Sequence, residues 1–204
     1  MKNLLLFVGV LLTLGTSSVT SMAQTSAQGD SHRFHTSAAA KAASEASKPS
    51  SATLSTFEKL KMLVGDWEAR DGTAYGGKPI RMSYKVASGG TSVMETYYQV
   101  GSDTDIDMVT VYHLDGDALM MTHFCVVNNQ VRLRAEPITG DGKVVSFNFI
   151  DASNLSVSHK EVMNKLEITF TDKDHLTQAW TWRMTNDKGK TFDEKAVYNF
   201  VRRK

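Results

Sequence analysis

The stretch LMMTHFCVVNNQVRLRA, from Leu119 to Ala135, holds the residues with the greatest potential for chemistry. It contains the only cysteine of the chain, Cys125, with His123 two residues before it and Arg132 and Arg134 after it. Residues two apart on a β-strand share a face, so the thiol and the imidazole could approach one another. A catalytic thiol also needs its base to be oriented by a third group, and no such residue is evident. We therefore predict no catalytic residue.

Metal chemistry has equally little support. A zinc or copper site requires three or four converging ligands, of which His123 and Cys125 supply two. The sequence contains neither HExxH nor CxxC, and the acidic run DTDID, Asp103 to Asp107, lacks the further ligands and closing glutamate of a calcium loop. We predict no metal site and interpret the acidic run as a solvated turn.

Two turn motifs predict which side chains share a face with His123. If Asp115-Gly116 and Asn128-Asn129 are both two-residue hairpin turns, cross-strand pairs follow by counting. His123 then opposes Met108 on one side and Arg134 on the other. The complete face comprises Met108, Thr110, Tyr112, Leu119, Met121, His123, Cys125, Arg132, Arg134 and Glu136. A slip of one residue in either turn would reverse the assignment on one strand.

Either face of this sheet could line an interior. The opposite face is the more apolar, which favours burying it. A polar face is tolerable inside when cavity water solvates it, and a free cysteine is more often buried than exposed. We favour the polar face inside, where Tyr112, His123, Arg132 and Arg134 would meet the polar end of a ligand. If that face points outward, the stretch is a solvated wall.

Other candidates lie on neighbouring strands. Trp67, Tyr97, Met121 and Trp180 would contact the apolar part of a ligand, because aromatic residues at a period of two also line the pocket of a hollow barrel. Glu95 shares a face with Tyr97; it either meets an arginine inside or lies on an exposed face. We count Glu95 among the ligand-binding candidates, together with Cys125 on the face of His123.

The elements that must position these residues are strands. Ser55 and Glu58 form a capping box for one short helix, which Gly65 ends. After Trp67 the hydrophobic period changes to two, and turn signals separate about ten runs. These runs lie near Asp66, Ile80, Thr91, Asp107, Ala118, Gln130, Lys143, Lys165, His175 and Thr191. The pattern predicts an all-β, antiparallel up-and-down barrel with one short N-terminal helix; a β-sandwich is the alternative.

The N-terminal quarter of the chain has a different composition. Lys2, an apolar run from Leu4 to Leu14 and the motif Ser21-Met22-Ala23 predict a cleaved signal peptide over residues 1–23. Residues 24–52 are rich in Ala, Ser and Thr and predict a disordered tether, and residues 53–204 form the barrel domain. We therefore expect export to the periplasm or the medium. The net charge of +1 gives no strong positive electrostatic field that would attract nucleic acid. After cleavage of the signal peptide we expect no membrane-spanning segment.

The helix leading into LVGDW, followed by a meander of strands, resembles the calycin group, especially its fatty-acid-binding-protein-like and nitrobindin-like barrels. The stretch MVTVYHLDGDALMMTHFCVVNNQVRLRA resembles uncharacterised exported bacterial proteins with lipocalin-like barrels. The first resemblance implies a polar, hydrated interior in which arginine and tyrosine meet an anionic head group. A nitrobindin-like barrel would imply haem on a histidine near the last strands. Phe192 to Val201 contains none, so we predict no haem and no other cofactor.

Together these features predict an exported β-barrel that binds a small amphipathic or anionic molecule in its interior, without covalent chemistry. One alternative is a hydrolase or isomerase that uses the same cavity. Another is an interaction module whose barrel is filled by side chains. The expected partner is a small molecule and not nucleic acid, and the sequence gives no indication of oligomeric state.

Overall fold

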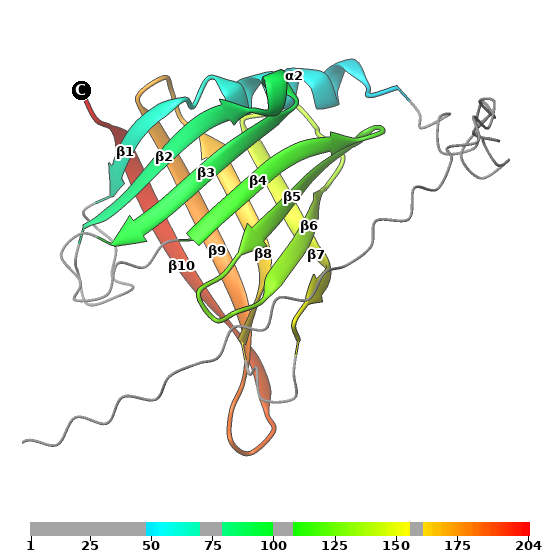
Figure 1. The fold of residues 1–204 in the computed structure, drawn as a ribbon, viewed down its shortest axis with the longest axis vertical. Coiled ribbons are helices and arrows are strands. Elements are labelled where there is room, and N and C mark those ends of the chain that lie inside the picture. Colours follow the sequence, from blue (N-terminus) through cyan, green and yellow to red (C-terminus); the bar gives the residue numbers. More distant parts are fainter. Residues whose placement is uncertain (1–47, 70–78, 100–107, 156–160) are drawn as a thin grey trace, which may run out of the picture. The chain divides into compact units, whose positions relative to one another are not determined.

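The computed structural model describes residues 48–69, 79–99, 108–155 and 161–204. The signal peptide, most of the tether and the acidic run Asp103 to Asp107 lie outside these residues. One α-helix and ten strands are described, and each strand pairs with its neighbours in sequence while β1 also pairs with β10 (Figure 1). The all-β, closed antiparallel barrel with one short helix confirms the predicted fold class.

The elements are α2 (Ser51–Lys61), β1 (Gly65–Ala69), β2 (Ile80–Ala87), η1 (Ser88–Gly90), β3 (Ser92–Gln99), β4 (Met108–Asp115), β5 (Ala118–Phe124), β6 (Gln130–Ala135), β7 (Val144–Ser153), β8 (Glu161–Phe170), β9 (His175–Thr185) and β10 (Thr191–Arg202).

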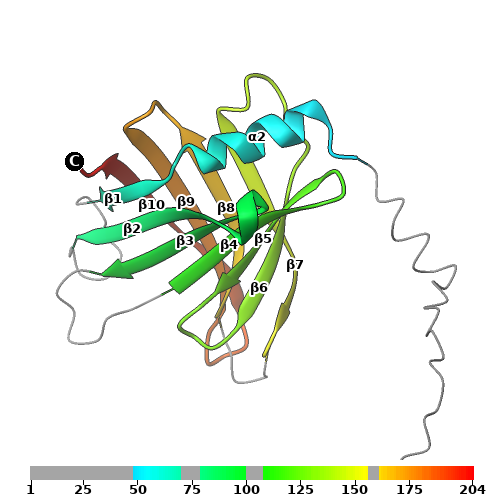
Figure 2. The ribbon, with the colours of Figure 1, turned by 45° about the horizontal axis from the view of Figure 1, so that its top comes forward.

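Helix α2 lies across one end of the barrel (Figure 2) and buries Leu60 completely. Its N-cap is Ser50, whose hydroxyl accepts a hydrogen bond from the Thr53 amide at 3.2 Å. The prediction that Ser55 caps this helix is therefore wrong. Asp117, in the turn between β4 and β5, accepts a hydrogen bond from the Ser50 amide, a tertiary contact that the local pattern around Ser55 does not contain. No helix in the described part of the chain is long and apolar enough to span a membrane.

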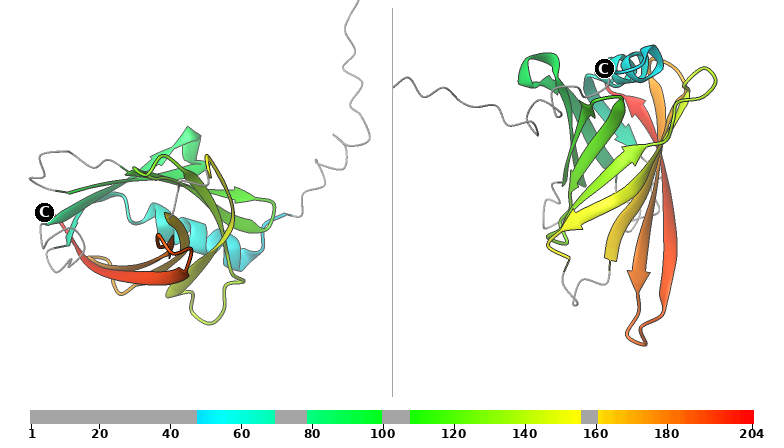
Figure 3. Two further views of the ribbon diagram at one scale, coloured as in Figure 1. Left: turned by 90° about the horizontal axis from the view of Figure 1, so that it is seen from below. Right: turned by 90° about the vertical axis from the view of Figure 1, so that its right-hand side faces the viewer.

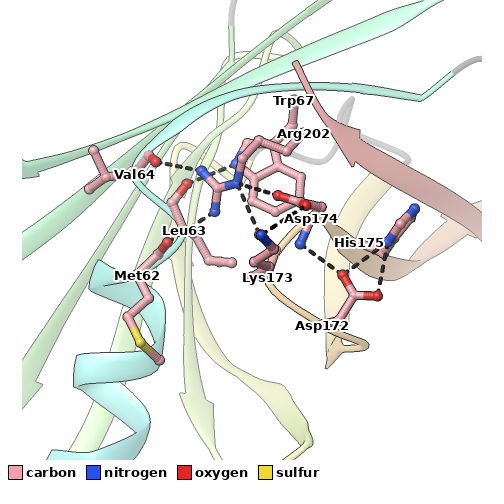
Figure 4. A network of polar contacts seen from close by, with 9 residues as sticks. All are labelled: Met62, Leu63, Val64, Trp67, Asp172, Lys173, Asp174, His175 and Arg202. Carbon is pink, nitrogen blue, oxygen red and sulfur yellow. Dashed lines mark hydrogen bonds and ion pairs between the residues drawn. The ribbon is translucent and has the colours of Figure 1, made fainter. Parts of the chain in front are cut away.

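Arg202 fastens the last strand to the first at the α2 end (Figure 4). Its guanidinium stacks on the Trp67 ring, 4.3 Å from the ring centre, and donates hydrogen bonds to the carbonyls of Val64 at 2.7 Å and Met62 at 3.1 Å. Gly65 lies against this group with a φ of +125°, and a Cβ atom there would come within 2.9 Å of Nη1. Position 65 therefore favours glycine, both for its positive φ and for the close approach of the Arg202 guanidinium.

The first hairpin keeps the predicted faces although its turn is shifted. Gly116 and Asp117 form the turn, so Thr110 opposes His123 and Tyr112 opposes Met121. Each residue of β4 therefore opposes a residue two positions further along β5 than predicted. Because side chains alternate with a period of two, the same residues still share a face. Tyr112, Met121 and His123 are all buried, so this part of the predicted face does point inward.

The second hairpin differs from the prediction. Its connection runs from Cys125 to Asn129, closed by a hydrogen bond from the Cys125 amide to the Asn129 carbonyl at 3.0 Å. His123 consequently opposes Val131, and Arg132 opposes Thr122. The prediction of a two-residue turn at Asn128-Asn129 is therefore wrong. The pairing partner of His123 shifts by three positions, from Arg134 to Val131, and a shift by an odd number moves each side chain of β6 to the opposite face. Arg132 and Arg134 lie on the outer surface, where both are exposed.

Two junctions between strands leave part of a long strand unpaired along that edge. In the described part of the chain, β1 pairs with β10 only at Trp67–Arg202 and Glu68–Val201. The pairing of β7 with β8 stops at Asn148–Lys165, although β7 continues along β6 and β8 begins earlier along β9. At the end opposite α2, here the far end, the barrel therefore consists of a wide leaf, β2 to β7, and a narrow leaf, β8 to β10. The β9–β10 hairpin extends beyond the other strands at this end (Figure 3).

Candidate functional site

A buried polar network joins the two leaves inside the barrel. Glu95 on β3 is 2% exposed and accepts hydrogen bonds from the Tyr112 hydroxyl at 2.9 Å and the Gln178 amide at 2.8 Å. The same amide nitrogen of Gln178 donates to the Tyr84 hydroxyl at 2.9 Å, and Trp180 Nε1 donates to Gln178 Oε1 at 3.0 Å. Strands β2, β3 and β4 are thus linked to β9 through one carboxylate and one amide.

The network is buried, and burial disfavours the charged form of its carboxyl group. Burial raises the pKa of Glu95, and hydrogen bonds from Tyr84 and Tyr112 oppose this only in part. Burial, followed by the nearby charge of Glu95, raises the pKa values of Tyr84 and Tyr112 well above 10. Both phenols therefore remain protonated donors at neutral pH. The carboxyl group is held as a hydrogen-bond acceptor in a setting that favours any cation able to reach it.

His123 lies next to this network with one ring nitrogen unpaired. Nδ1 is 2.9 Å from the Thr110 hydroxyl oxygen, and the ring centre is 4.9 Å from that of Trp180. Burial lowers the pKa of His123 to about 4, so the imidazole is neutral at physiological pH. Its Nε2 is buried and has no hydrogen-bond partner among the described residues. An unpaired buried polar atom costs about 1–3 kcal/mol, which a suitable ligand atom would recover.

A small pocket lies between the two leaves, and His123 is one of the residues that line it. Besides Glu95 and His123 it is lined by Tyr97, Met108, Met163, Trp180, Trp182 and Tyr198. Its enclosed volume is about 20 Å³, which is room for one water-sized group, and it measures about 330 Å³ when the space open to solvent is included. None of the lining residues within the described part of the chain is a lysine or an arginine. Most of the barrel interior is filled by side chains.

The pocket brings together part of the predicted site. Glu95, Tyr97, His123 and Trp180 all line it. Tyr112 lies behind Glu95 as its hydrogen-bond donor.

The other sequence candidates lie elsewhere. Met121 is fully buried in the core, and Trp67 is at the α2 end, where its Nε1 donates to the Leu63 carbonyl at 2.8 Å. Cys125 is half-buried in the β5–β6 connection, and burial raises the pKa of its thiol. No group of three or more His, Cys, Asp or Glu side chains suited to a metal occurs in the described ranges.

The two arginines do not contribute to the pocket. Arg132 forms an exposed, two-pronged ion pair with Asp151 on the outer wall. Arg134 lies on the same outer face. The proposed grouping of both arginines with His123 in the interior is therefore wrong, because the longer β5–β6 connection turns their side chains outward.

Sequence reasoning missed Tyr84, Met163, Gln178 and Tyr198. A signal was available for Gln178, because it shares the period-two face of Leu176 and Trp180. The glutamine is fully buried, and it is the polar exception on that face.

The sequence matches no family model and no curated protein. Among solved structures, the crystal structure of Rv2717c from M. tuberculosis is similar, with a TM-score of 0.49 and 12% sequence identity, over 73% of this chain and 98% of that chain. The protein is therefore classified by its own strand pairing. It is a closed, ten-stranded antiparallel β-barrel, a fold that could bind a ligand.

Proposed function

We propose that the barrel binds a small amphipathic amine, with its ammonium group in the pocket between the leaves. The observation that carries this proposal is the unpaired, buried Nε2 of His123 in a pocket that Glu95 also lines. A neutral imidazole and a carboxylate can both accept N–H hydrogen bonds. An ammonium would satisfy both and would compensate the buried charge of Glu95.

The size and the walls of the pocket favour the same head group. The space that a water-sized group can occupy in the pocket is about 20 Å³, which suits a small head group such as a primary ammonium. Four aromatic side chains line the pocket, and aromatic faces attract cations. The two methionines offer adaptable apolar contacts for an alkyl chain.

An anionic head group, expected when Arg132 and Arg134 were placed inside, has lost its support. The arginines lie outside, and among the described residues that line the pocket Glu95 carries the one carboxyl group, with no lysine or arginine beside it. An anion there would be repelled by Glu95 and would find no compensating charge. Binding in the interior of the barrel remains the mode that the calycin-like resemblance implies.

Fluorescence titration with three eight-carbon probes tests the proposal. Trp180 and Trp182 line the pocket and report its occupancy. We expect octylamine to bind more tightly than octanol, and octanoate to bind most weakly. Glu95→Gln should weaken octylamine binding by about tenfold or more, since hydrogen bonds to charged groups contribute about 1.5–3 kcal/mol.

Two controls make the titration decisive. Octanol should bind the Glu95→Gln variant as it binds the wild type, which shows that the pocket is intact. Glu136→Gln removes an exposed carboxylate from the α2 end and should leave octylamine binding unchanged. Octanoate binding as tightly as octylamine would refute the ammonium site. If none of the three probes binds, the barrel is filled and its function lies on the outer surface.

We also propose, from residues 1–23, that the protein is exported before it acts. Processing after Ala23 would leave Gln24 as the first residue. N-terminal sequencing of the protein recovered from the periplasm or the medium should give Gln24. A mature chain that keeps Met1 and remains in the cytoplasm would contradict export.

A further inference from the structure

Two more carboxylates lie beside the pocket, on the part of the narrow leaf nearest the far end. Glu194 on β10 directly opposes Trp182, and Glu161 on β8 directly opposes Met184, two residues further along β9. Opposed residues share a sheet face, as do residues two apart on one strand. Because Trp182 lines the pocket, both glutamates are on the pocket side of the leaf. We call these two residues the acidic rim.

Within the ranges that the structure describes, no basic side chain balances the acidic rim. Neither Glu161 nor Glu194 forms an ion pair with any described residue. Burial raises the pKa of Glu161, and the negative charge of Glu194 raises it further. A ligand cation at the rim would oppose this rise in pKa.

The rim and the pocket are separated by a distance that can be derived from the strand geometry. Glu95 is hydrogen-bonded to Gln178, and the rim begins at Trp182, four residues further along β9. At about 3.3 Å per residue, the backbone position opposite Glu194 is about 13 Å from Gln178 along β9, and the position opposite Glu161 is about 20 Å from it. Between the two positions the lining consists of Trp180, Trp182 and Met163, and it is apolar.

We propose that the ligand is a linear diamine or polyamine, with one ammonium at Glu95 and His123 and a second at the acidic rim. This inference rests on the proposed amine-binding function and specifies its ligand class. The methylene chain would lie along Trp182 and Met163. The extended length of spermidine approaches the shorter of these backbone separations, whereas putrescine is much too short to bridge it.

Calorimetric titration of the full folded chain with spermidine, putrescine and octylamine, at one fixed ionic strength, tests the inference. We expect spermidine to bind most tightly of the three. The double variant Glu161→Gln, Glu194→Gln should weaken spermidine binding by about tenfold, because it removes two partly exposed ion pairs. The same variant should leave octylamine binding unchanged, since octylamine has no second ammonium.

The outcomes separate this inference from the function on which it rests. Spermidine binding that is unaffected by the double variant, or that is no tighter than octylamine binding, would overturn the diamine assignment while the amine pocket stands. Putrescine binding as tightly as spermidine would overturn the two-point geometry. An equal loss with the control Glu136→Gln would show that spermidine responds only to net charge. Octylamine binding that is insensitive to Glu95→Gln would instead refute the amine pocket itself.

Discussion

Acid should destabilise the barrel through His123. The folded state holds this imidazole neutral, with a pKa lowered to about 4 by burial, whereas an unfolded chain protonates it near pH 6.5. Between these values the unfolded state binds the proton and the folded state does not. The stability that depends on neutral His123 is therefore complete above pH 6.5 and is lost as the pH falls toward 4.

The size of the effect follows from the pKa difference. It is about 2.5 pKa units at about 1.4 kcal/mol per unit, so full loss corresponds to about 3 kcal/mol of unfolding free energy. The measurement is urea unfolding of the wild type and of His123→Gln at a series of pH values from 7 to 4. We expect the stability of the wild type relative to the variant to fall by about 3 kcal/mol over this range.

The comparison isolates one residue because other titrating groups are common to both proteins. Glu95 acts in the opposite direction: burial raises its pKa, so its contribution to stability increases as the pH falls. That contribution is present in the wild type and in His123→Gln and cancels in the difference. Parallel curves of unfolding free energy against pH for the two proteins would refute the argument, since they would mean that His123 titrates normally in the fold.

Three further outcomes are expected. Iodoacetamide should label Cys125 more slowly than a free thiol at neutral pH, because burial raises the thiol pKa, and rapid labelling seen by mass spectrometry would contradict this. Gly65→Ala should lower the unfolding free energy by about 1–3 kcal/mol in urea, because its φ of +125° and the nearby Arg202 both oppose a side chain; an unchanged midpoint would be the contrary result. The double variant Arg132→Ala, Arg134→Ala should bind octylamine as the wild type does, and a loss would place the arginines in the site.

Strand positions were predictable because the alternation of apolar residues reflects a pleated sheet with one buried face. Ile80, Ala118, Gln130, His175 and Thr191 each begin a strand, as the pattern predicts. Burial of every second side chain is a local property of the sequence, so it survives without knowledge of the tertiary structure.

The residues that form the site were less predictable, because their assignment depends on whether the β5–β6 connection has an odd or an even number of residues. Asn128 has a positive φ, as expected of asparagine in a turn, but Cys125 and Asn129 close a longer connection than two residues. The extra residues reverse the faces of β6, so Arg132 and Arg134 exchange places with Val131 and Leu133. The alternation within β6 itself, with apolar Val131 and Leu133 on one face, favoured burying that face, and the assumed length of the turn overrode it.

The network around Glu95 illustrates a second limit. Whether a strand glutamate is buried depends on partners that come from other strands, here Tyr112 and Gln178. Gln178 is 83 residues from Glu95 in the sequence, so no local pattern connects the two.

The short junction between β7 and β8 gives the barrel a stiffness that varies along its axis. At the α2 end, continuous pairing and the contacts of Arg202 oppose deformation. Beyond Asn148 and Lys165, a force that separates the leaves would bend two sheets and would break no hydrogen bonds between β7 and β8. The hydrogen bonds from Gln178 to Glu95 and Tyr84 are therefore contacts that hold the wide leaf against the narrow leaf inside the barrel, and any opening of the pocket would strain them.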